Sequence, residues 1–363
     1  MPNKIKVLII DDSALIRQLL SKILNSDPMI QVVGTAEDPI YARNKIKDLK
    51  PDVLTLDIEM PRMDGITFLK NLMRLHPMPV VMISTFTKAG ADITLEALEL
   101  GAIDFIPKPK LDVIDQLQSY SRDIIEKVKM AATARVRPLM DRPDRLTKTI
   151  PDNPFDSNKT VHKSSSSYLK TTNKIIALGS STGGTEAIKE ILMKMPASAP
   201  GIVISQHIPA AFSASFAKRM NDNCAMQVYH AEDGQQILPG NVYIAPGTHH
   251  LQVEKSGARY ICRLNNGPLV NRHKPSVEVM FRSVVKSAGP NAIGVMLTGM
   301  GSDGAQAMKE MHDVGSVTIA QDENTSVVWG MPGSAVKLGA VDHVLPIGKI
   351  TEKILSLSKK LSH

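Results

Sequence analysis

Short apolar runs alternate with segments of helical periodicity along the first 130 residues. Between the first two runs, apolar pairs beginning at Leu15, Leu19 and Ile23 recur at a spacing that gives a helix one apolar face. This alternation predicts a parallel sheet covered by helices on both faces. The predicted strands are residues 4–10, 30–33, 52–56, 79–83 and 102–106.

The second half of the chain repeats this pattern. Apolar runs at residues 174–178, 201–206 and 291–297 predict strands, and residues 185–195 predict a helix. The expected fold class is therefore α/β, with two doubly wound parallel-sheet domains joined by a flexible linker.

Length and composition agree with two domains. The chain has 363 residues, of which 43% are hydrophobic and 22% charged, as in ordinary soluble globular proteins. The sequence contains no apolar run long enough for a membrane helix and does not begin with a signal-peptide pattern, so we expect a cytoplasmic protein without membrane insertion. The two cysteines, Cys224 and Cys262, suggest neither a disulfide framework nor a zinc site.

The formal net charge of +7 is concentrated in one segment. Residues 131–170 contain eight basic and four acidic residues, together with four prolines and a run of serines at 164–167. Such a composition cannot bury enough apolar surface to fold, and about forty flexible residues span roughly 35 Å. We therefore expect domains at 1–128 and 173–363, a basic linker at 129–172, and no nucleic-acid partner.

Polar side chains follow the predicted strands of the first domain, where such sheets place their chemistry. The acidic pair Asp11 and Asp12 follows the first strand, Asp57 the third, Ser84 the fourth and Lys108 the fifth. Three convergent carboxylates favour a hard cation such as Mg²⁺. A carboxylate beside that ion can accept a phosphoryl group, and Asp57 is the candidate acceptor. Taken singly, Asp12 could cap the helix that follows, and a lone aspartate at the end of a strand is more often a cap or turn residue than a catalytic residue.

The joint pattern resembles the response-regulator receiver family. The resemblance covers residues 1 to about 125 and rests on segments 7–13 and 56–61 and on the Lys-Pro pair at 108–109. It implies a flavodoxin-like fold and phosphorylation of Asp57 by a histidine kinase phosphodonor. It also implies Mg²⁺ binding by Asp12, Asp57 and the Glu59 carbonyl, with Asp11 contributing through water. The implied switch residues are Lys108, the mobile aromatic Phe105, and a hydroxyl assigned to Ser84 in preference to Thr85.

In the second domain, a strand, a small-residue turn and a helix meet at residues 179–184. A dinucleotide-binding turn fits poorly, because the middle glycine and a later acidic ribose ligand are missing. The sequence Gly179-x-Ser181-x-Gly183 instead fits a nucleophile elbow with Ser181 as the nucleophile. A turn rich in serine and glycine, without chemistry, is at least as good an interpretation of this segment alone.

Two later strands supply partners for a serine nucleophile. The strand at 201–206 is followed by His207, and the strand at 291–297 by a glycine-rich turn containing Asp303. A histidine base and an aspartate that orients it would complete a triad in the chain order Ser, His, Asp. The alternatives are a structural histidine and an Asx turn. The other histidines lack metal-ligand spacing, so no metal or cofactor is expected at this site.

Four segments of the second half resemble the chemotaxis protein-glutamate methylesterase family: residues 179–187, 206–210, 271–277 and 298–304. The resemblance implies a Rossmann-like catalytic domain in which Ser181 is the nucleophile, His207 the general base and Asp303 its orienter. It also places the Met300 backbone N–H in the oxyanion site. Ser302 departs from the asparagine that is frequent in relatives.

The two resemblances together imply a phosphorylation-activated hydrolase. Its substrates would be methyl-ester glutamates, and particular glutamines, on the cytoplasmic helices of chemoreceptors, with methanol or ammonia released. We further hypothesise that the unphosphorylated receiver covers the crevice around Ser181. Two rival outputs are a DNA-binding domain, for which the chain offers no basic helix-turn-helix, and a non-catalytic docking module with an esterase fold.

Overall fold

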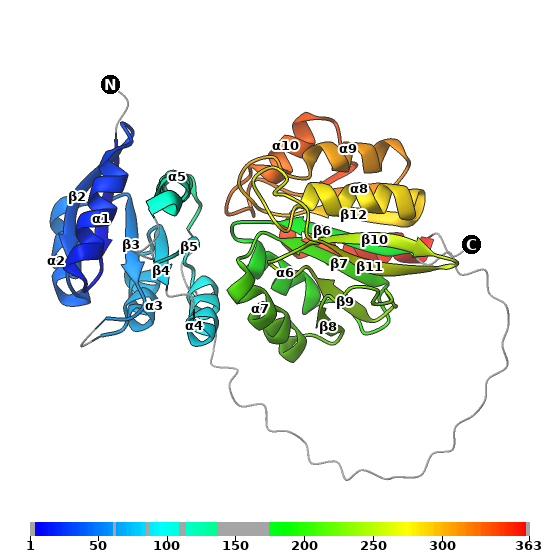
Figure 1. The fold of residues 1–363 in the computed structure, drawn as a ribbon, viewed down its shortest axis with the longest axis horizontal. Helices are drawn as coiled ribbons and strands as arrows, with labels where there is room; N and C mark the ends of the chain where they lie inside the picture. The colour runs from blue at the N-terminus through cyan, green and yellow to red at the C-terminus, as the bar shows by residue number, and fades with distance from the viewer. Residues whose placement is uncertain (1–3, 61–62, 85–86, 109–113, 137–173, 361–363) are drawn as a thin grey trace, which may run out of the picture.

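The computed structural model describes residues 4–60, 63–84, 87–108, 114–136 and 174–360. These residues form two α/β domains that lie side by side (Figure 1). The linker predicted at 129–172 lies mostly outside the described residues. The helix before it reaches Thr133 and so crosses the boundary predicted at residue 128. Within the described segments, no helix combines the length and the apolar character needed to cross a membrane.

The first domain is a five-stranded parallel sheet in the order β2-β1-β3-β4-β5, which confirms the predicted fold class. Each strand is followed by a helix. The strands are β1 (Ile5–Ile10), β2 (Ile30–Ala36), β3 (Val53–Asp57), β4 (Val80–Ser84) and β5 (Asp104–Pro107). The helices are α1 (Ala14–Asn25), α2 (Pro39–Leu49), α3 (Gly65–Leu75), α4 (Lys88–Glu99) and α5 (Ile114–Thr133).

Alternation along β1 explains the two helical layers of this domain. Val7 and Ile9 face a core that includes side chains of α1 and α5, whereas Leu8 and Ile10 face the core beneath α2 and α3. Because successive strand residues point to opposite faces, an apolar run buries both sides of the sheet.

The second domain has a seven-stranded parallel sheet in the order β14-β13-β12-β6-β7-β9-β8. The predicted strands correspond to β6 (Ile175–Ser180), β7 (Gly201–Gln206) and β12 (Ala292–Met296). The outer strands are β8 (Gln227–His230), β9 (Asn241–Ile244), β13 (Val317–Gln321) and β14 (His343–Leu345).

Helices cover both faces of this sheet as well. One layer contains α6 (Gly184–Leu192), α7 (Ala210–Asn223) and α11 (Ile347–Lys360). The other contains α8 (Val277–Ser287), α9 (Ala305–Asp313) and α10 (Met331–Lys337), with the short helix η1 (Gly289–Asn291) before β12. An antiparallel hairpin of β10 (His250–Ser256) and β11 (Arg259–Asn265) packs beside α8, outside the main sheet.

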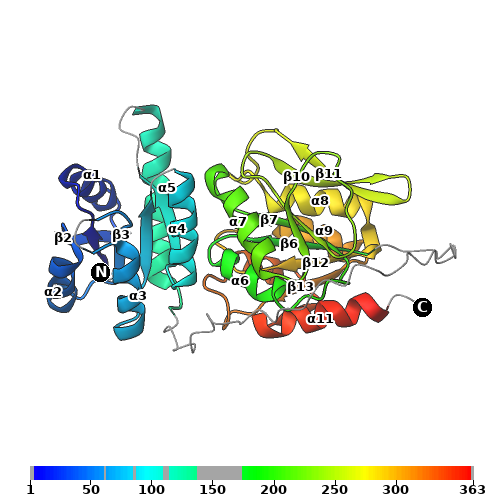
Figure 2. The ribbon, with the colours of Figure 1, turned by 90° about the horizontal axis from the view of Figure 1, so that it is seen from below.

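The first domain presents α4 and α5 to the second domain, which presents α6 and α7 (Figures 1 and 2). Phe105 of β5 packs against Phe212 of α7, with ring centroids 4.5 Å apart. The buried cluster around these rings is continuous between the two domains. The contact is therefore an apolar interface with charged groups around it.

Candidate active site and phosphoacceptor site

Ser181 lies in the turn between β6 and α6. Its backbone N–H donates to the carbonyl of Thr298, 3.0 Å away, so the turn is tied to the end of β12. Gly183 has a φ of 74°, in the left-handed region that glycine tolerates best. A Cβ added to Gly299 would lie 2.8 Å from the Cβ of Ser181, so only glycine allows this close approach. The expected sharp turn is present.

The side chain of Gln206 joins the turns after β6 and β7. Its Nε2 donates to the carbonyls of Ser181 and His207 at 2.8 and 3.1 Å. Its Oε1 accepts a hydrogen bond from the hydroxyl of Ser180. The His207 N–H in turn donates to the Ser180 carbonyl. These bonds fix the backbones that carry Ser181 and His207.

His207 and Asp303 form the hydrogen-bonded pair that the sequence predicted. The Nε2 of His207 lies 2.8 Å from Oδ2 of Asp303, and both side chains are almost fully buried. Since Nε2–H donates to the carboxylate, Nδ1 is the basic nitrogen. The buried Nδ1 has no hydrogen-bond partner in the described part of the chain. Ser181, in particular, makes no hydrogen bond with His207 among these residues.

Asp303 precedes α9 in the sequence, but its carboxylate lies at the N-terminus of α8 among several hydrogen-bond donors. The Asn271 amide and the Ser276 hydroxyl each donate to Oδ1 at 2.8 Å, and the N–H of Val277 donates to Oδ2 at 2.7 Å. Burial alone would raise the pKa of Asp303, but His207 and these side-chain donors outweigh it and lower the pKa to about 2. Asp303 is therefore ionised and fixed in orientation.

His273 covers one face of the His207 ring. The ring centroids are 3.6 Å apart and the planes differ by 14°. Burial, followed by the nearby charge of His207, lowers the pKa of His273 to about 4, so its ring is neutral at pH 7. The imidazole of His207 thus has a carboxylate at one edge and a neutral ring against its face.

Met300 lies in the loop after β12, next to the Gly299 backbone that touches Ser181. The N–H of Gly299 donates to the Val328 carbonyl, whereas the N–H of Met300 has no partner among the described residues. The N–H of Ser181 is occupied, so the Met300 N–H, one residue after the Gly299 backbone that approaches Ser181, is a candidate donor for this site. The Met300 side chain packs with Val327 and Val328 against an apolar cluster that includes α5 of the first domain.

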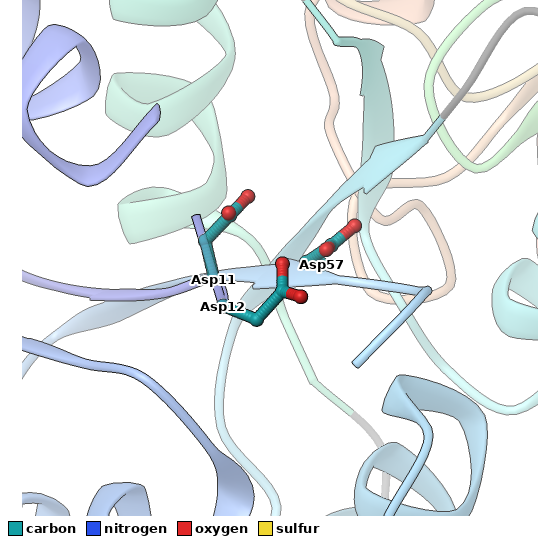
Figure 3. Close-up of side chains that lie close together, drawn as sticks. All are labelled: Asp11, Asp12 and Asp57. Carbon is teal, nitrogen blue, oxygen red and sulfur yellow. The ribbon is translucent and has the colours of Figure 1, made fainter. Parts of the chain in front are cut away.

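Asp11, Asp12 and Asp57 lie close together at the ends of β1 and β3 (Figure 3). Carboxylate oxygens of Asp11, Asp12 and Asp57 lie within 4.8 Å of one another, with Asp11 and Asp57 buried. Lys108 Nζ donates to Oδ2 of Asp57 at 2.7 Å. Burial raises the pKa of Asp57 to about 6 despite this bond, and burial also raises the pKa of Asp11.

These carboxylates fit a divalent cation. Oδ2 of Asp11 and Oδ1 of Asp57 are buried without a hydrogen-bond partner among the described residues, so each offers a free ligand atom. An oxygen-only donor set with one exposed member, Asp12, suits Mg²⁺, which keeps several waters.

The predicted switch residues connect this site to the domain interface. The Ser84 hydroxyl shares a hydrogen bond of 2.6 Å with Thr94 of α4, and Thr85 lies outside the described residues. Phe105 is buried against Phe212 of the second domain, with Lys127 Nζ 5.3 Å from its ring centroid. A displacement of Phe105 would therefore disturb the interface directly.

Comparisons with known proteins match both halves of the chain. The CheB methylesterase family model matches residues 176–354, and the response regulator receiver domain model matches residues 7–118. A protein-glutamate methylesterase/protein-glutamine glutaminase of Hydrogenovibrio crunogenus is 59% identical over 99% of this chain and 100% of its own length. The chain belongs to the CheB methylesterase family. A relative of the same description from Xanthomonas campestris pv. campestris is 54% identical over 99% of this chain and 98% of its own length.

A solved structure supports the fold of the second domain. The CheB methylesterase catalytic domain of Thermotoga maritima is 37% identical and has a TM-score of 0.50. The match covers 51% of this chain and 98% of that one. The combination of a receiver with a methylesterase catalytic domain, inferred from short motifs, is thus confirmed for this chain.

Sequence reasoning missed several residues that build the site. Asn271, His273 and Ser276 lie in segment 271–277, which resembles the methylesterase family, but its sequence pattern indicated no role for them. A cluster of polar residues directly before an apolar helix could have pointed to them, because helix N-termini bind carboxylates. Gln206 had no comparable signal, since its role depends on the pairing of β6 with β7.

Proposed function

We propose that this chain is a phosphorylation-activated hydrolase of chemoreceptors. It demethylates glutamate methyl esters and deamidates particular glutamines. The observation that carries the proposal is the hydrogen bond between His207 and Asp303 beside the Ser181 turn. These residues follow β7, β12 and β6, three adjacent strands of one sheet. In a doubly wound sheet the crevice at this reversal of strand order is the usual place for catalysis.

In the proposed mechanism, Ser181 attacks the side-chain acyl carbon while its proton passes to Nδ1 of His207. The Met300 N–H donates to the developing oxyanion. The tetrahedral intermediate collapses, and His207 returns the proton to the leaving methanol or ammonia. Water then attacks the acyl-enzyme with His207 again as base, releasing glutamate and the serine hydroxyl. Asp303 holds the imidazole in the required tautomer and stabilises its cation.

The first domain controls this reaction through Asp57, which we assign as the phosphoryl acceptor. Asp11, Asp12 and Asp57 would hold Mg²⁺, which neutralises negative charge on a phosphoryl group when bound. Lys108 contacts the acceptor carboxylate and would contact the phosphoryl oxygens in its place. Ser84, Thr94 and Phe105 link this site to α4 and to Phe212, so phosphorylation would loosen a receiver that covers the Ser181 crevice.

The partners follow from the two activities. A histidine kinase supplies the phosphoryl group, and the methylated cytoplasmic regions of chemoreceptors supply the esters, so we place the protein in the cytoplasm. The rival output, a DNA-binding or non-catalytic domain, is not favoured, because the second half matches a methylesterase family.

Methanol release from methylated receptor membranes tests the proposal. We expect release by the native protein to rise when a small-molecule phosphodonor and Mg²⁺ are added. Ser181→Ala should abolish release with and without the phosphodonor, whereas Ser256→Ala, in the exposed tip of the hairpin, should not change it. Equal release by Ser181→Ala and the native protein would refute the assignment. Asp57→Asn should abolish the increase in release caused by the phosphodonor and leave release without phosphodonor unchanged.

A further inference from the structure

Most ion pairs between the two described domains join a receiver carboxylate to a cation of the catalytic domain. Glu99, at the end of α4, accepts hydrogen bonds from Lys189 of α6 and from both Nε and Nη2 of Arg219 of α7. The three side chains are only 18 to 29% exposed. Two cations of the catalytic domain thus converge on one receiver carboxylate.

A second ion pair of the same polarity lies on the other helix of the receiver face. Glu126 of α5 accepts a hydrogen bond of 3.1 Å from Arg272. Arg272 directly precedes His273, whose ring stacks on His207. Here again the catalytic domain contributes the cation and the receiver the anion.

A third receiver carboxylate reaches the catalytic turn itself. Asp104 of β5 accepts a hydrogen bond from the hydroxyl of Thr182, the residue after Ser181. One interdomain pair has the opposite polarity, since Arg135 of the receiver side contacts Glu323. The partners of that pair are 50 and 59% exposed, and Arg272 is 71% exposed, so both of these pairs lie at the solvent-facing edge of the contact, whereas Glu99 and its two cations lie deeper.

The cations belong to the elements that carry the triad. Lys189 lies on the helix that follows Ser181, Arg219 on the helix that follows His207, and Arg272 in the segment that holds Asp303 through Asn271. Without the receiver, Lys189, Arg219 and Arg272 would lose the carboxylates of Glu99 and Glu126 with which they pair. Unpaired cations at the mouth of a reaction site attract anionic partners.

We propose that Lys189, Arg219 and Arg272 form a docking surface for an acidic helical segment of the substrate. In the unphosphorylated protein, Glu99 and Glu126 on helices α4 and α5 occupy this surface in place of that segment. The inference rests on the proposed function, because a receptor helix rich in glutamate presents the carboxylates that the surface would bind. It names the residues that recognise the substrate before chemistry begins.

A simpler role for these cations is to hold the receiver in place, and a charge swap separates the two roles. Glu99→Arg, Arg219→Glu and the double variant are compared in the full-length protein, by methanol release with and without phosphodonor. Both single variants should raise release without phosphodonor, and the double variant should restore repression in part, because the swapped ion pair re-forms while Lys189 then faces a cation.

KM and kcat of the phosphorylated variants distinguish a docking role from a role only in holding the receiver. Arg219→Glu and the double variant should raise KM for methylated receptor membranes about tenfold, as expected for about 1.4 kcal/mol of lost attraction, with kcat within about twofold. Glu99→Arg should leave KM unchanged. Lys218→Glu makes the same charge change at an adjacent, 82% exposed residue and should also leave KM unchanged. An unchanged KM in Arg219→Glu and in the double variant would overturn the proposal.

Direct binding distinguishes failure of this inference from failure of the proposed function. Ser181→Ala protein, phosphorylated and sedimented with methylated receptor membranes, should bind more weakly when Arg219→Glu is added. If neither the native protein nor any variant releases methanol but binding still depends on Arg219, the proposed hydrolase activity is refuted and the proposed docking surface is supported. If Arg219→Glu does not change the amount of protein that sediments with the membranes, the proposed docking surface is refuted.

Discussion

The imidazoles of His207 and His273 lie face to face, with centroids 3.6 Å apart. Asp303 fixes one edge of the His207 ring, and the stacked ring of His273 limits rotation of the His207 imidazole out of its own plane. His273 therefore acts as a positioning residue for the base. Its neighbour Arg272 contacts the receiver, so the same short segment joins the catalytic base to the interface.

Replacing the stacked ring should slow the reaction without preventing substrate binding. Stacked aromatic pairs contribute about 0.5 to 1.5 kcal/mol, so His273→Ala should lower kcat between about twofold and about thirteenfold and leave KM within about twofold. His273→Phe keeps a flat ring at this position and should retain kcat within about twofold. Equal losses in both variants would show that stacking is not the relevant property.

Asn271 should contribute to catalysis by holding the carboxylate of Asp303 in place. Asn271→Ala removes a 2.8 Å hydrogen bond to a buried carboxylate, and such bonds contribute about 1.5 to 3 kcal/mol. We expect kcat/KM for methanol release to fall at least tenfold in the phosphorylated protein. Asn265→Ala, in the exposed end of the hairpin, serves as the matched control. Full activity in Asn271→Ala would mean that Ser276 and the α8 backbone suffice to orient Asp303.

The low pKa of Asp303 predicts a pH-dependent stability. Because the folded-state pKa of about 2 lies below the ordinary 3.8, ionised Asp303 stabilises the fold above about pH 4. This contribution is lost as the pH falls toward 2. The difference in unfolding free energy between native protein and Asp303→Asn should shrink by about 1 kcal/mol between pH 5 and pH 3.

Urea unfolding followed by tryptophan fluorescence measures this difference in the catalytic domain alone, because Trp329 is the chain's single tryptophan. A difference that stays constant between pH 5 and pH 3 would contradict the assigned pKa.

The receiver should repress through Phe105. Phe105→Ala removes a buried ring that packs on Phe212, so the interface weakens and methanol release without phosphodonor should rise several-fold. Release with phosphodonor should change little, because the receiver is then already displaced. Phe68→Ala, which opens a cavity elsewhere in the receiver core, controls for general destabilisation of that domain. A similar rise in both variants would remove Phe105 from the switch.

The sequence predicted the central strands of both sheets and the half-buried β2, but not the outer strands β9 and β13, although these are mostly buried. The strands β1, β3, β6 and β12 are mostly apolar, and the polar residues at their ends therefore stood out. The outer strands β8 and β14 have only four and three residues, and β14 has no buried position, so the span is too short for periodicity to identify them.

The interface could not be predicted in the same way. Glu99, Arg219 and Arg272 are ordinary charged residues on helices and loops, and only the docking of the two domains brings them together. The same holds for His273, whose partner lies 66 positions earlier in the chain. Contacts between separately folded surfaces depend on tertiary placement, which local pattern does not encode.

Labelling with a fluorophosphonate tests the central claim most directly, because this reagent phosphonylates a serine that a neighbouring base has activated. After activation with phosphodonor and digestion of the labelled protein, mass spectrometry should place the adduct on Ser181. His207→Ala should lose the label, and Asn265→Ala should keep it. An adduct on Ser180, or labelling of Ser181 that survives His207→Ala, would contradict the triad.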